Sequence, residues 1–589
     1  MAGLPLASRQ RVHAYAGPAP VAVPADAPTL EAALLLEGVE AIAFSPGRHH
    51  LPRGAALRTR LRLAGSGRAE LVLGAPIVVR SHEGLVLEGL TFREAAEGSR
   101  SPGDGVSALV RVDLSHVDAE GPDGQESEAK TAVLLRNCRL YGGHHALEAR
   151  GSWGLRPRAG CKLHLRRRKA FPVGDFLDSA RAWSARRSSR VCLVDCELVG
   201  SREEAVSAQR GACVEVPGTF VHHCGHGITI SRCLDASAMI SGMGPMRLRV
   251  EGSRFEDLTK HPWSAAVAVG HVGAGADAGT GLDEVEIVGC SVERCCVGVA
   301  ACRARLWMRG SRLADMELGG VQLADSYACL QDNTVEGCGG AGLALASGPG
   351  PGCGLVAELR GNVVRGCDVG LRISASGASP CQLSACGDTF EGNGDAVCTG
   401  GSVSRRGESC PTQGLPSGAP RSASCTARLT GCRLLGSRRA GLRVGRSSRA
   451  VLRGCSVAGN GRGVTVAAWA AADVQGCRFE DNVGWALRLE DDAASAAAAS
   501  TEGTLAGSAY EWTSGTRGVR RRRAMWRLAA ARQWSRRRSG SGRSSGERRR
   551  TQLSCSPASR SPESRPHAGA HASTRARPPH ACSPVHVHL

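Results

Sequence analysis

A repeat of about 22 residues runs through most of this 589-residue chain and limits the folds that it can adopt. Each copy has a short alternating apolar stretch, a Gly followed by an anchor residue, and a second Gly with another apolar stretch. The copies anchored at Cys290 and Cys455 match at six positions. Successive anchors lie 21 and 22 residues apart from Cys290 through Ser311 to Asn333. A period of this length is typical of solenoids in which each repeat forms one coil.

Each repeat contains two or three apolar stretches of only 3–5 residues that alternate with period two, such as Val285 to Ile287 and Leu371 to Ile373. Stretches this short and this rich in β-branched residues predict strands, with Gly-rich corners between them. A strand pair of this size cannot bury its apolar face alone, whereas stacked coils share a continuous core. Parallel strands joined by crossovers are right-handed. The sequence therefore predicts an all-β chain that forms one right-handed parallel β-helix.

The composition suits the narrow interior of such a coil. Aromatic residues make up only 4% of the chain, which contains 77 Gly and 25 Cys. We expect the anchor residues to form an inward ladder with one member per coil, in which cysteines pack as small apolar side chains and stay reduced. The cysteine anchors are Cys138, Cys196, Cys290, Cys432, Cys455 and Cys477; the others are Ser253, Ser311, Asn333, Asn362 and Asp388.

The β-helix is predicted to occupy residues 29–490, after a flexible leader at 1–28. Two insertions interrupt its period, near 150–190 and 397–424. From residue 491 the repeat stops, and the Arg- and Ser-rich segment 491–589 is predicted to be a disordered tail.

A short cap helix is predicted over Thr29 to Glu37, where Leu30, Ala33 and Leu34 share one helical face and would cover the open edge of the first coil. This start and the repeats after it resemble pectin-lyase-like right-handed β-helix proteins, whose repeats occur in carbohydrate-binding proteins, sugar hydrolases and certain F-box proteins. The resemblance covers about residues 28–490. It implies the fold, which hosts many activities.

The net charge of +20 belongs mainly to two segments that lack the repeat. Arg517 to Leu589 contains 18 Arg and 2 Glu and so carries +16, and Arg150 to Arg190 contains 12 Lys or Arg and 2 Asp and so carries +10. The rest of the chain carries −6. The basic composition is therefore no evidence of a nucleic-acid-binding domain, and we expect nucleic acid to bind only through the tail, if at all.

The strongest candidate for chemistry is the Gly-His-Gly sequence around His226, which precedes an alternating strand. Glu203 and Glu204 lie 23 and 22 residues before it, so Glu204 and His226 are expected to stack in adjacent coils. His145 holds the equivalent position in the preceding repeat. The sequence resembles a polygalacturonase motif, in which a histidine assists a carboxylate pair. Cleaving a glycosidic bond needs two carboxyl groups, and an imidazole can relay a proton.

This resemblance is partial, because polygalacturonases carry Asp at the carboxylate positions and Gly227-Ile228 also fits the repeat of this chain. A structural corner role for His226 is therefore the alternative. His222 and His223 point to opposite faces of a strand and cannot share an ion with His226. The sequence predicts no metal site and no cofactor.

The main hypothesis for function is a non-catalytic scaffold that binds a protein or a polysaccharide along the β-helix face. The first alternative is a carbohydrate-active enzyme (a polysaccharide hydrolase, lyase or epimerase), and the second is nucleic-acid binding by the tail. Neither a signal peptide nor a span of roughly 20 apolar residues is recognisable. We therefore expect a monomer in the cytoplasm that does not bind membranes.

Overall fold

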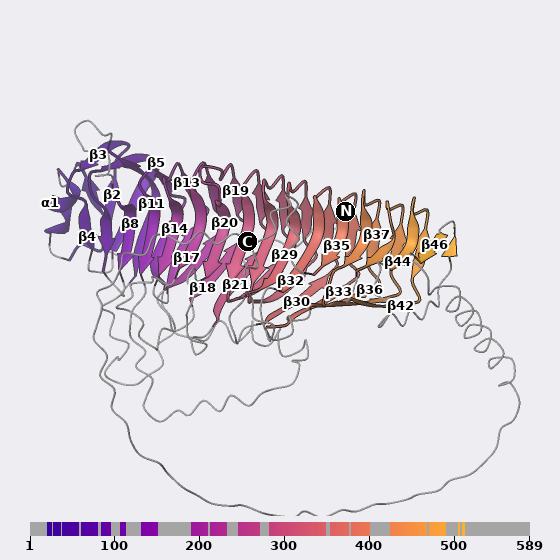
Figure 1. The fold of residues 1–589 in the computed structure, drawn as a ribbon. Helices are drawn as coiled ribbons and strands as arrows, with labels where there is room; N and C mark the ends of the chain where they lie inside the picture. Colours follow the sequence, from indigo (N-terminus) through magenta and orange to yellow (C-terminus); the bar gives the residue numbers. More distant parts are fainter. Residues whose placement is uncertain are drawn as a thin grey trace, which may run out of the picture. The chain divides into compact units, whose positions relative to one another are not determined.

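The computed structural model of the chain shows an elongated stack of β-strand coils (Figure 1). It describes residues 20–25, 28–36, 38–57, 61–80, 84–95, 106–113, 131–150, 190–209, 212–231, 246–270, 282–348, 354–375, 379–400, 425–467 and 470–489, and the backbone of 505–506 and 509–512. Within these residues no helix is long and apolar enough to cross a membrane.

Three ladders of parallel strands build the stack, and each coil contributes one strand to each ladder. The long-strand ladder comprises β9 (Thr131–Arg136), β12 (Arg190–Val194), β15 (Cys213–Pro217), β18 (Arg247–Glu251), β21 (Asp283–Val288), β24 (Ala304–Arg309), β27 (Tyr327–Gln331), β30 (Leu355–Arg360), β33 (Cys381–Cys386), β36 (Cys425–Thr430), β39 (Ser448–Arg453) and β42 (Ala471–Gln475). The short-strand ladder comprises β10 (Arg139–Tyr141), β13 (Glu197–Val199), β16 (Phe220–His222), β19 (Arg254–Glu256), β22 (Ser291–Glu293), β25 (Arg312–Ala314), β28 (Thr334–Glu336), β31 (Val363–Arg365), β34 (Thr389–Glu391), β37 (Arg433–Leu435), β40 (Ser456–Ala458), β43 (Arg478–Glu480) and β45 (Leu505–Ala506). Sheet B comprises β4 (Ala55–Leu57), β6 (Ile77–Val79), β8 (Ala108–Asp113), β11 (His145–Arg150), β14 (Glu204–Gln209), β17 (His226–Ser231), β20 (Ala265–Gly270), β23 (Val297–Cys302), β26 (Gly319–Ala324), β29 (Ala341–Ser347), β32 (Val369–Ala375), β35 (Asp395–Thr399), β38 (Ala440–Val444), β41 (Val464–Val466), β44 (Trp485–Leu489) and β46 (Ala509–Trp512).

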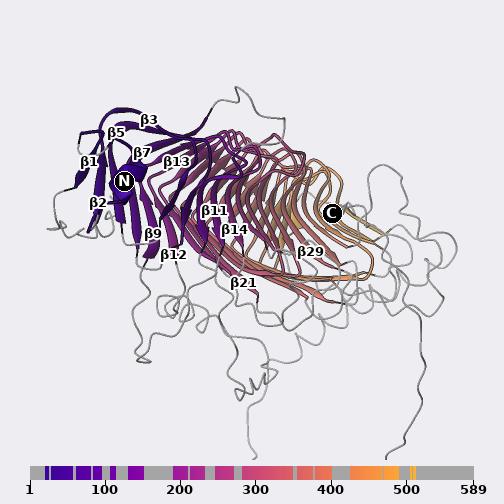
Figure 2. The ribbon, with the colours of Figure 1, turned by 90° about the vertical axis from the view of Figure 1, so that its left-hand side faces the viewer.

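The N-terminal end, which Figure 2 shows in front of the later coils, contains the two longest described strands, β5 and β7. Strand β7 pairs with both β9 and β10 and so leads into two ladders. A short helix, α1, lies within the segment predicted to form the cap helix, and its hydrogen-bonded turns end at Leu34. The side chain of Thr29 accepts a hydrogen bond from the backbone N–H of Ala32 and caps the helix, whose Leu30 is buried. The elements here are β1 (Val21–Val23), α1 (Leu30–Leu34), β2 (Ala41–Phe44), β3 (Gly47–Leu51), β5 (Leu61–Leu73) and β7 (Leu85–Glu94).

The predicted boundaries of the β-helix differ from the structure in three places. Strand β1 falls inside the predicted leader 1–28 and pairs with β2. Strand β35 runs into the predicted insertion 397–424, because the backbone of Val397 pairs with that of Leu371. Strands β45 and β46 lie beyond residue 490 and pair with β43 and β44. The rest of the tail, most of the leader and most of both insertions lie outside the described residues.

Each coil bends just before its anchor residue, which then points into the core. Gly289 has φ +61° and precedes the buried Cys290, and Asp332 has φ +52° and precedes the buried Asn333. This left-handed conformation favours Gly, Asn and Asp, which explains the residue types before the anchors. Burial raises the pKa of the Cys290 thiol to about 11, so the thiol stays protonated. The predicted ladder of buried anchors is confirmed for all eleven residues, and Thr219 belongs to it as well.

The second Gly of the repeat serves a different purpose, because it lies where adjacent coils approach closely. A Cβ atom added to Gly298 would lie 2.4 Å from Cδ2 of Leu313 and 2.5 Å from the carbonyl oxygen of Gly320. The equivalent residues in other coils include Gly227, Gly320, Gly342, Gly370 and Gly441. The Gly of each Gly-apolar pair is therefore required because a larger side chain would clash with the adjacent coil.

Gly298→Ala is therefore expected to lower the free energy of unfolding by about 1–3 kcal/mol, because a backbone carbonyl cannot move aside as a side chain can. Urea unfolding followed by circular dichroism measures the change. Gly431→Asn is the control, since Gly431 has φ +60° and open space around it. An equal loss in both variants would contradict a close-packing role for Gly298.

Candidate active site

Three of the four candidate residues begin neighbouring strands of sheet B. His145 is the first residue of β11, Glu204 of β14 and His226 of β17. The backbones of Glu204 and His226 are partners in the parallel ladder, so the predicted stacking of these two residues is confirmed. Glu203 directly precedes β14, where its carbonyl oxygen accepts a hydrogen bond from the backbone N–H of His226.

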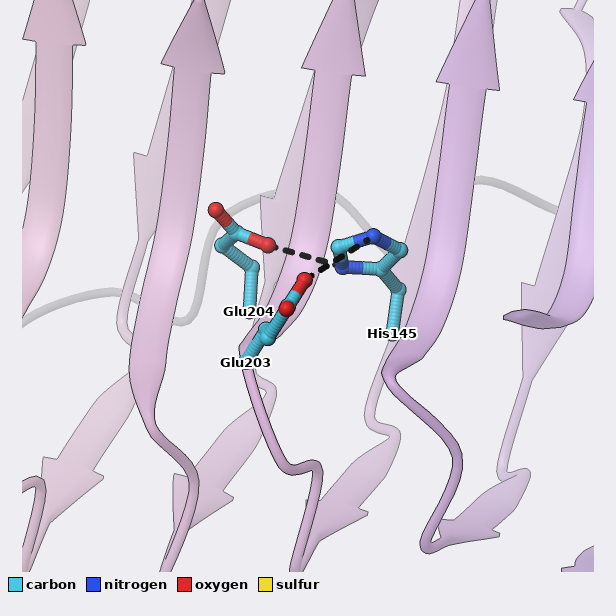
Figure 3. Close-up of side chains that lie close together, drawn as sticks. All are labelled: His145, Glu203 and Glu204. Carbon is cyan, nitrogen blue, oxygen red and sulfur yellow. Dashed lines mark ion pairs between the residues drawn. The ribbon is translucent and has the colours of Figure 1, made fainter. Parts of the chain in front are cut away.

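The side chain of His145 faces both carboxylates from one side (Figure 3). Its Nδ1 is 2.8 Å from Oε2 of Glu204, and its Nε2 is 3.6 Å from Oε2 of Glu203. His144 adds a longer contact, with Nδ1 3.8 Å from Oε1 of Glu203. One imidazole therefore connects two carboxylates of the next coil.

This cluster lies partly open to solvent and is incompletely hydrogen-bonded. The exposed fraction of the side chain is 55% for Glu203, 21% for Glu204 and 17% for His145. Nδ1 of His145 and Oε2 of Glu204 are buried atoms, and their contact does not have hydrogen-bond geometry. Glu203 is thus accessible to a ligand, while deeper polar atoms remain without a hydrogen bond in the described structure.

The two ends of the His145–Glu204 contact have opposite pKa shifts. Burial would lower the pKa of His145, but the contact with Glu204 and the charges of both glutamates outweigh it and raise this pKa. Burial would raise the pKa of Glu204, but His145 outweighs it and lowers this pKa. Both shifts favour the charged forms, an imidazolium paired with a carboxylate.

His226 has a different environment from His145. Burial lowers its pKa, and although the charge of Glu204 opposes this effect, the result is a lowered pKa. Its Nδ1 accepts a hydrogen bond of 3.3 Å from the backbone N–H of Ala265. Neutral His226 therefore carries its proton on Nε2, where it can donate to a ligand. The ring stacks on that of His261, with 5.7 Å between centroids and 18° between planes.

The other histidines of the motif lie apart from His226, but the prediction that His222 and His223 point to opposite faces is wrong, because their Nδ1 atoms lie 3.2 Å apart. Nε2 of His222 lies 3.3 Å from Oε1 of Glu197 in the short-strand ladder. His223 has φ +56° in the turn, and Cys224 points into the core. None of these three residues joins the His226 site.

Sequence reasoning missed several neighbours of the site. His261 stacks on His226, and Nζ of Lys260 donates a hydrogen bond of 3.2 Å to the carbonyl oxygen of Ser201. Both residues lie just before β20, the strand next to β17 in sheet B, and Ala265 is the residue of β20 that is equivalent to His226. Aligning the repeats could therefore have placed these two residues near the site. The contact of Glu203 with His145 had no such signal, because it depends on side-chain direction at a corner.

The cluster offers the groups needed for proton transfer on a bound molecule. The two carboxylates can accept a proton or stabilise positive charge, and the imidazoles can donate one. The ligand atoms of His145, Glu203 and Glu204 all lie within 4.8 Å of one another. The prediction of no metal site did not anticipate this convergence.

No known protein family matches the chain, and no curated protein matches its sequence. Among solved structures, the chain is similar to the periplasmic alginate epimerase AlgG, with 12% identity, a TM-score of 0.34 and coverage of 81% of this chain and 85% of that one. It is also similar to the catalytic domain of GH87 α-1,3-glucanase in complex with nigerose, with 9% identity, a TM-score of 0.32 and coverage of 77% and 66%. The strand ladders themselves confirm the predicted all-β fold, in which parallel strands stack as a β-helix.

Proposed function

We propose that this β-helix acts on a polysaccharide, that Glu203 and Glu204 supply the proton-transfer groups, and that His226 donates a hydrogen bond to the substrate. The observation that carries the proposal is the register of Glu204 with His226, which sets a carboxylate and an imidazole side by side on sheet B. His145 holds both carboxylates in place from the preceding coil. A mere corner role for His226 would not require this concentration of titratable side chains.

A long ligand suits the surface beside the cluster. The next row of sheet B contains small side chains in register, from the buried Ser207 to the half-buried Thr229, Ala268 and Ala300. Neighbouring strands lie about 4.8 Å apart, so this row forms a strip across several coils. An extended polymer can lie on such a strip, with the scissile bond at the carboxylates.

The short-strand ladder is a poorer place for a charged ligand, because its own charges pair between coils. Arg312 lies 2.5 Å from Glu293 on one side and 2.6 Å from Glu336 on the other. Arg365 makes a second ion pair with Glu336. These partners would have to separate before a ligand could use them, which favours the sheet B face.

In this proposal the carboxylates act as base or stabilise positive charge, and the Nε2–H of His226 donates a hydrogen bond to a sugar oxygen. Cleavage by hydrolysis needs two carboxyl groups at the bond, which Glu203 and Glu204 provide. Cleavage by elimination needs a base near the sugar ring, which either carboxylate provides. The products distinguish the two reactions, because elimination leaves an unsaturated uronide.

The test measures reducing ends and unsaturated uronides after incubating the full chain with pectin, alginate and α-glucans. We expect one of these products, and His226→Ala should lower its rate of formation by about 100-fold or more. His222→Ala is the matched control, because that histidine lies on the neighbouring ladder. If no substrate yields product, or if His226→Ala is as active as the wild type, the proposal fails and a non-catalytic scaffold remains.

A further inference from the structure

We infer that His145, Glu203 and Glu204 form a binding site for one divalent transition-metal ion, of which Zn²⁺ is the best match. His145 comes from β11, and the two carboxylates come from the start of β14 in the next coil. The three side chains point toward one another (Figure 3), and one potential ligand atom from each lies within 4.8 Å of the others. Coil stacking thus brings the imidazole of His145 to two adjacent carboxylates that lie 58 and 59 residues later in the sequence.

The His145–Glu204 contact leaves two buried atoms without a hydrogen bond. Nδ1 of His145 and Oε2 of Glu204 lie 2.8 Å apart as an ion pair, but the contact lacks hydrogen-bond geometry. Buried polar atoms without a hydrogen-bond partner are uncommon in folded proteins. An ion bound by both atoms would replace this contact with two metal–ligand bonds.

The distances need only small adjustments to accept an ion. Zn²⁺ binds nitrogen and oxygen ligands at about 2.0–2.2 Å, so two ligands on one ion lie at most about 4.4 Å apart. The present separations start at 2.8 Å between His145 and Glu204 and do not exceed 4.8 Å. Glu203, whose side chain is 55% exposed, has room to rotate toward the other two.

Charge and ligand type favour a transition metal over Ca²⁺. Two carboxylates carry two negative charges, which an imidazolium balances only in part and a divalent ion balances fully. Imidazole nitrogen is a good ligand for Zn²⁺, whereas Ca²⁺ prefers sites made of six to eight oxygen atoms. A bound ion and a proton compete for the ring nitrogen of His145, so the ion pair is the metal-free state of the same three residues.

The experiment titrates the reduced full chain with Co²⁺ and Zn²⁺ in the absence of any polysaccharide. We expect the wild type to bind one more ion per chain than His145→Ala, with visible Co²⁺ absorption that lacks a thiolate charge-transfer band. Glu204→Gln and Glu203→Gln should each weaken this site by about 10-fold or more. Comparing variants is essential, because the chain has 18 His and 25 Cys that can also bind metal.

Glu197→Gln and His222→Ala are the matched controls, because they remove a His–Glu contact that has no second carboxylate. They should keep the extra ion, and circular dichroism should show that all variants are folded. Equal numbers of bound ions in the wild type and in His145→Ala would overturn the inference, as would equal affinity for Ca²⁺. The ion would occupy the carboxylates that the proposed function assigns to proton transfer, so the two roles exclude each other while the ion is bound. Since no substrate is present, the binding result does not depend on the proposed function.

Discussion

Phe255→Ala is expected to lower the free energy of unfolding by about 3–5 kcal/mol. Phe255 lies in β19 with 0% of its surface exposed, and its register partners are Val221 and Val292 in the adjacent coils. Removing the ring leaves a cavity that these coils cannot close without losing their own register. Urea unfolding of the full chain, followed by circular dichroism, measures the loss.

Phe220→Ala is the control, one coil earlier in the same ladder. Phe220 is half-buried and stacks on His222 with 4.3 Å between ring centroids, and the guanidinium of Arg254 lies 5.3 Å from its ring. Losing these outer contacts should cost about 1 kcal/mol. A similar small cost for Phe255→Ala would contradict a tightly packed interior.

Asp388→Asn is expected to stabilise the protein by about 2 kcal/mol at neutral pH. Asp388 is fully buried at an anchor position, where burial raises its pKa from 3.8 to about 6. Its Oδ1 accepts two hydrogen bonds from Asn362, and its Oδ2 accepts one from the backbone N–H of Cys386. Asparagine removes the buried charge, worth about 3 kcal/mol for this pKa shift, but loses the bond to Cys386, worth about 1 kcal/mol.

The sign of this effect depends on pH. Because the folded-state pKa of Asp388 is raised, the carboxyl group stabilises the fold below pH 3.8, and this contribution is lost as the pH rises to about 6. The variant has no such group, so its advantage over the wild type should disappear near pH 4. Urea unfolding of both proteins at about pH 7 and pH 4 measures this difference. A variant less stable at pH 7, or a difference independent of pH, would show that Asp388 carries no buried charge.

The repeat made the fold predictable because each coil meets the same steric demands. A left-handed residue precedes an inward anchor, as at Gly289 and Cys290, and this pairing is visible in the letters alone. The coil anchored at Thr219 escaped notice, because Gly218-Thr219 leads to Gly-His-Gly rather than to the usual ending. The boundaries of the β-helix were less predictable, because short strands such as β1 form by pairing with a neighbouring coil rather than through their own sequence.

The repeat predicted which site residues are neighbours along the backbone, but it did not predict where their side chains point. Counting 22 residues placed Glu204 beside His226, and the ladder confirms it. The period carries no information on side-chain rotation at corners, so the contacts of His145 with both carboxylates could not be read from it. The unusual pKa values and the metal-like arrangement both arise from those contacts.

The most direct test of the proposed active site compares Glu204→Gln with Glu197→Gln on whichever polysaccharide the wild type cleaves. Both variants remove one charge near a histidine, but only Glu204 lies in the sheet B cluster. We expect Glu204→Gln to lower kcat by about 100-fold or more while the protein stays folded, and Glu197→Gln to retain wild-type activity. Equal activity of the two variants, or a wild type that cleaves no polysaccharide, would contradict the proposed function.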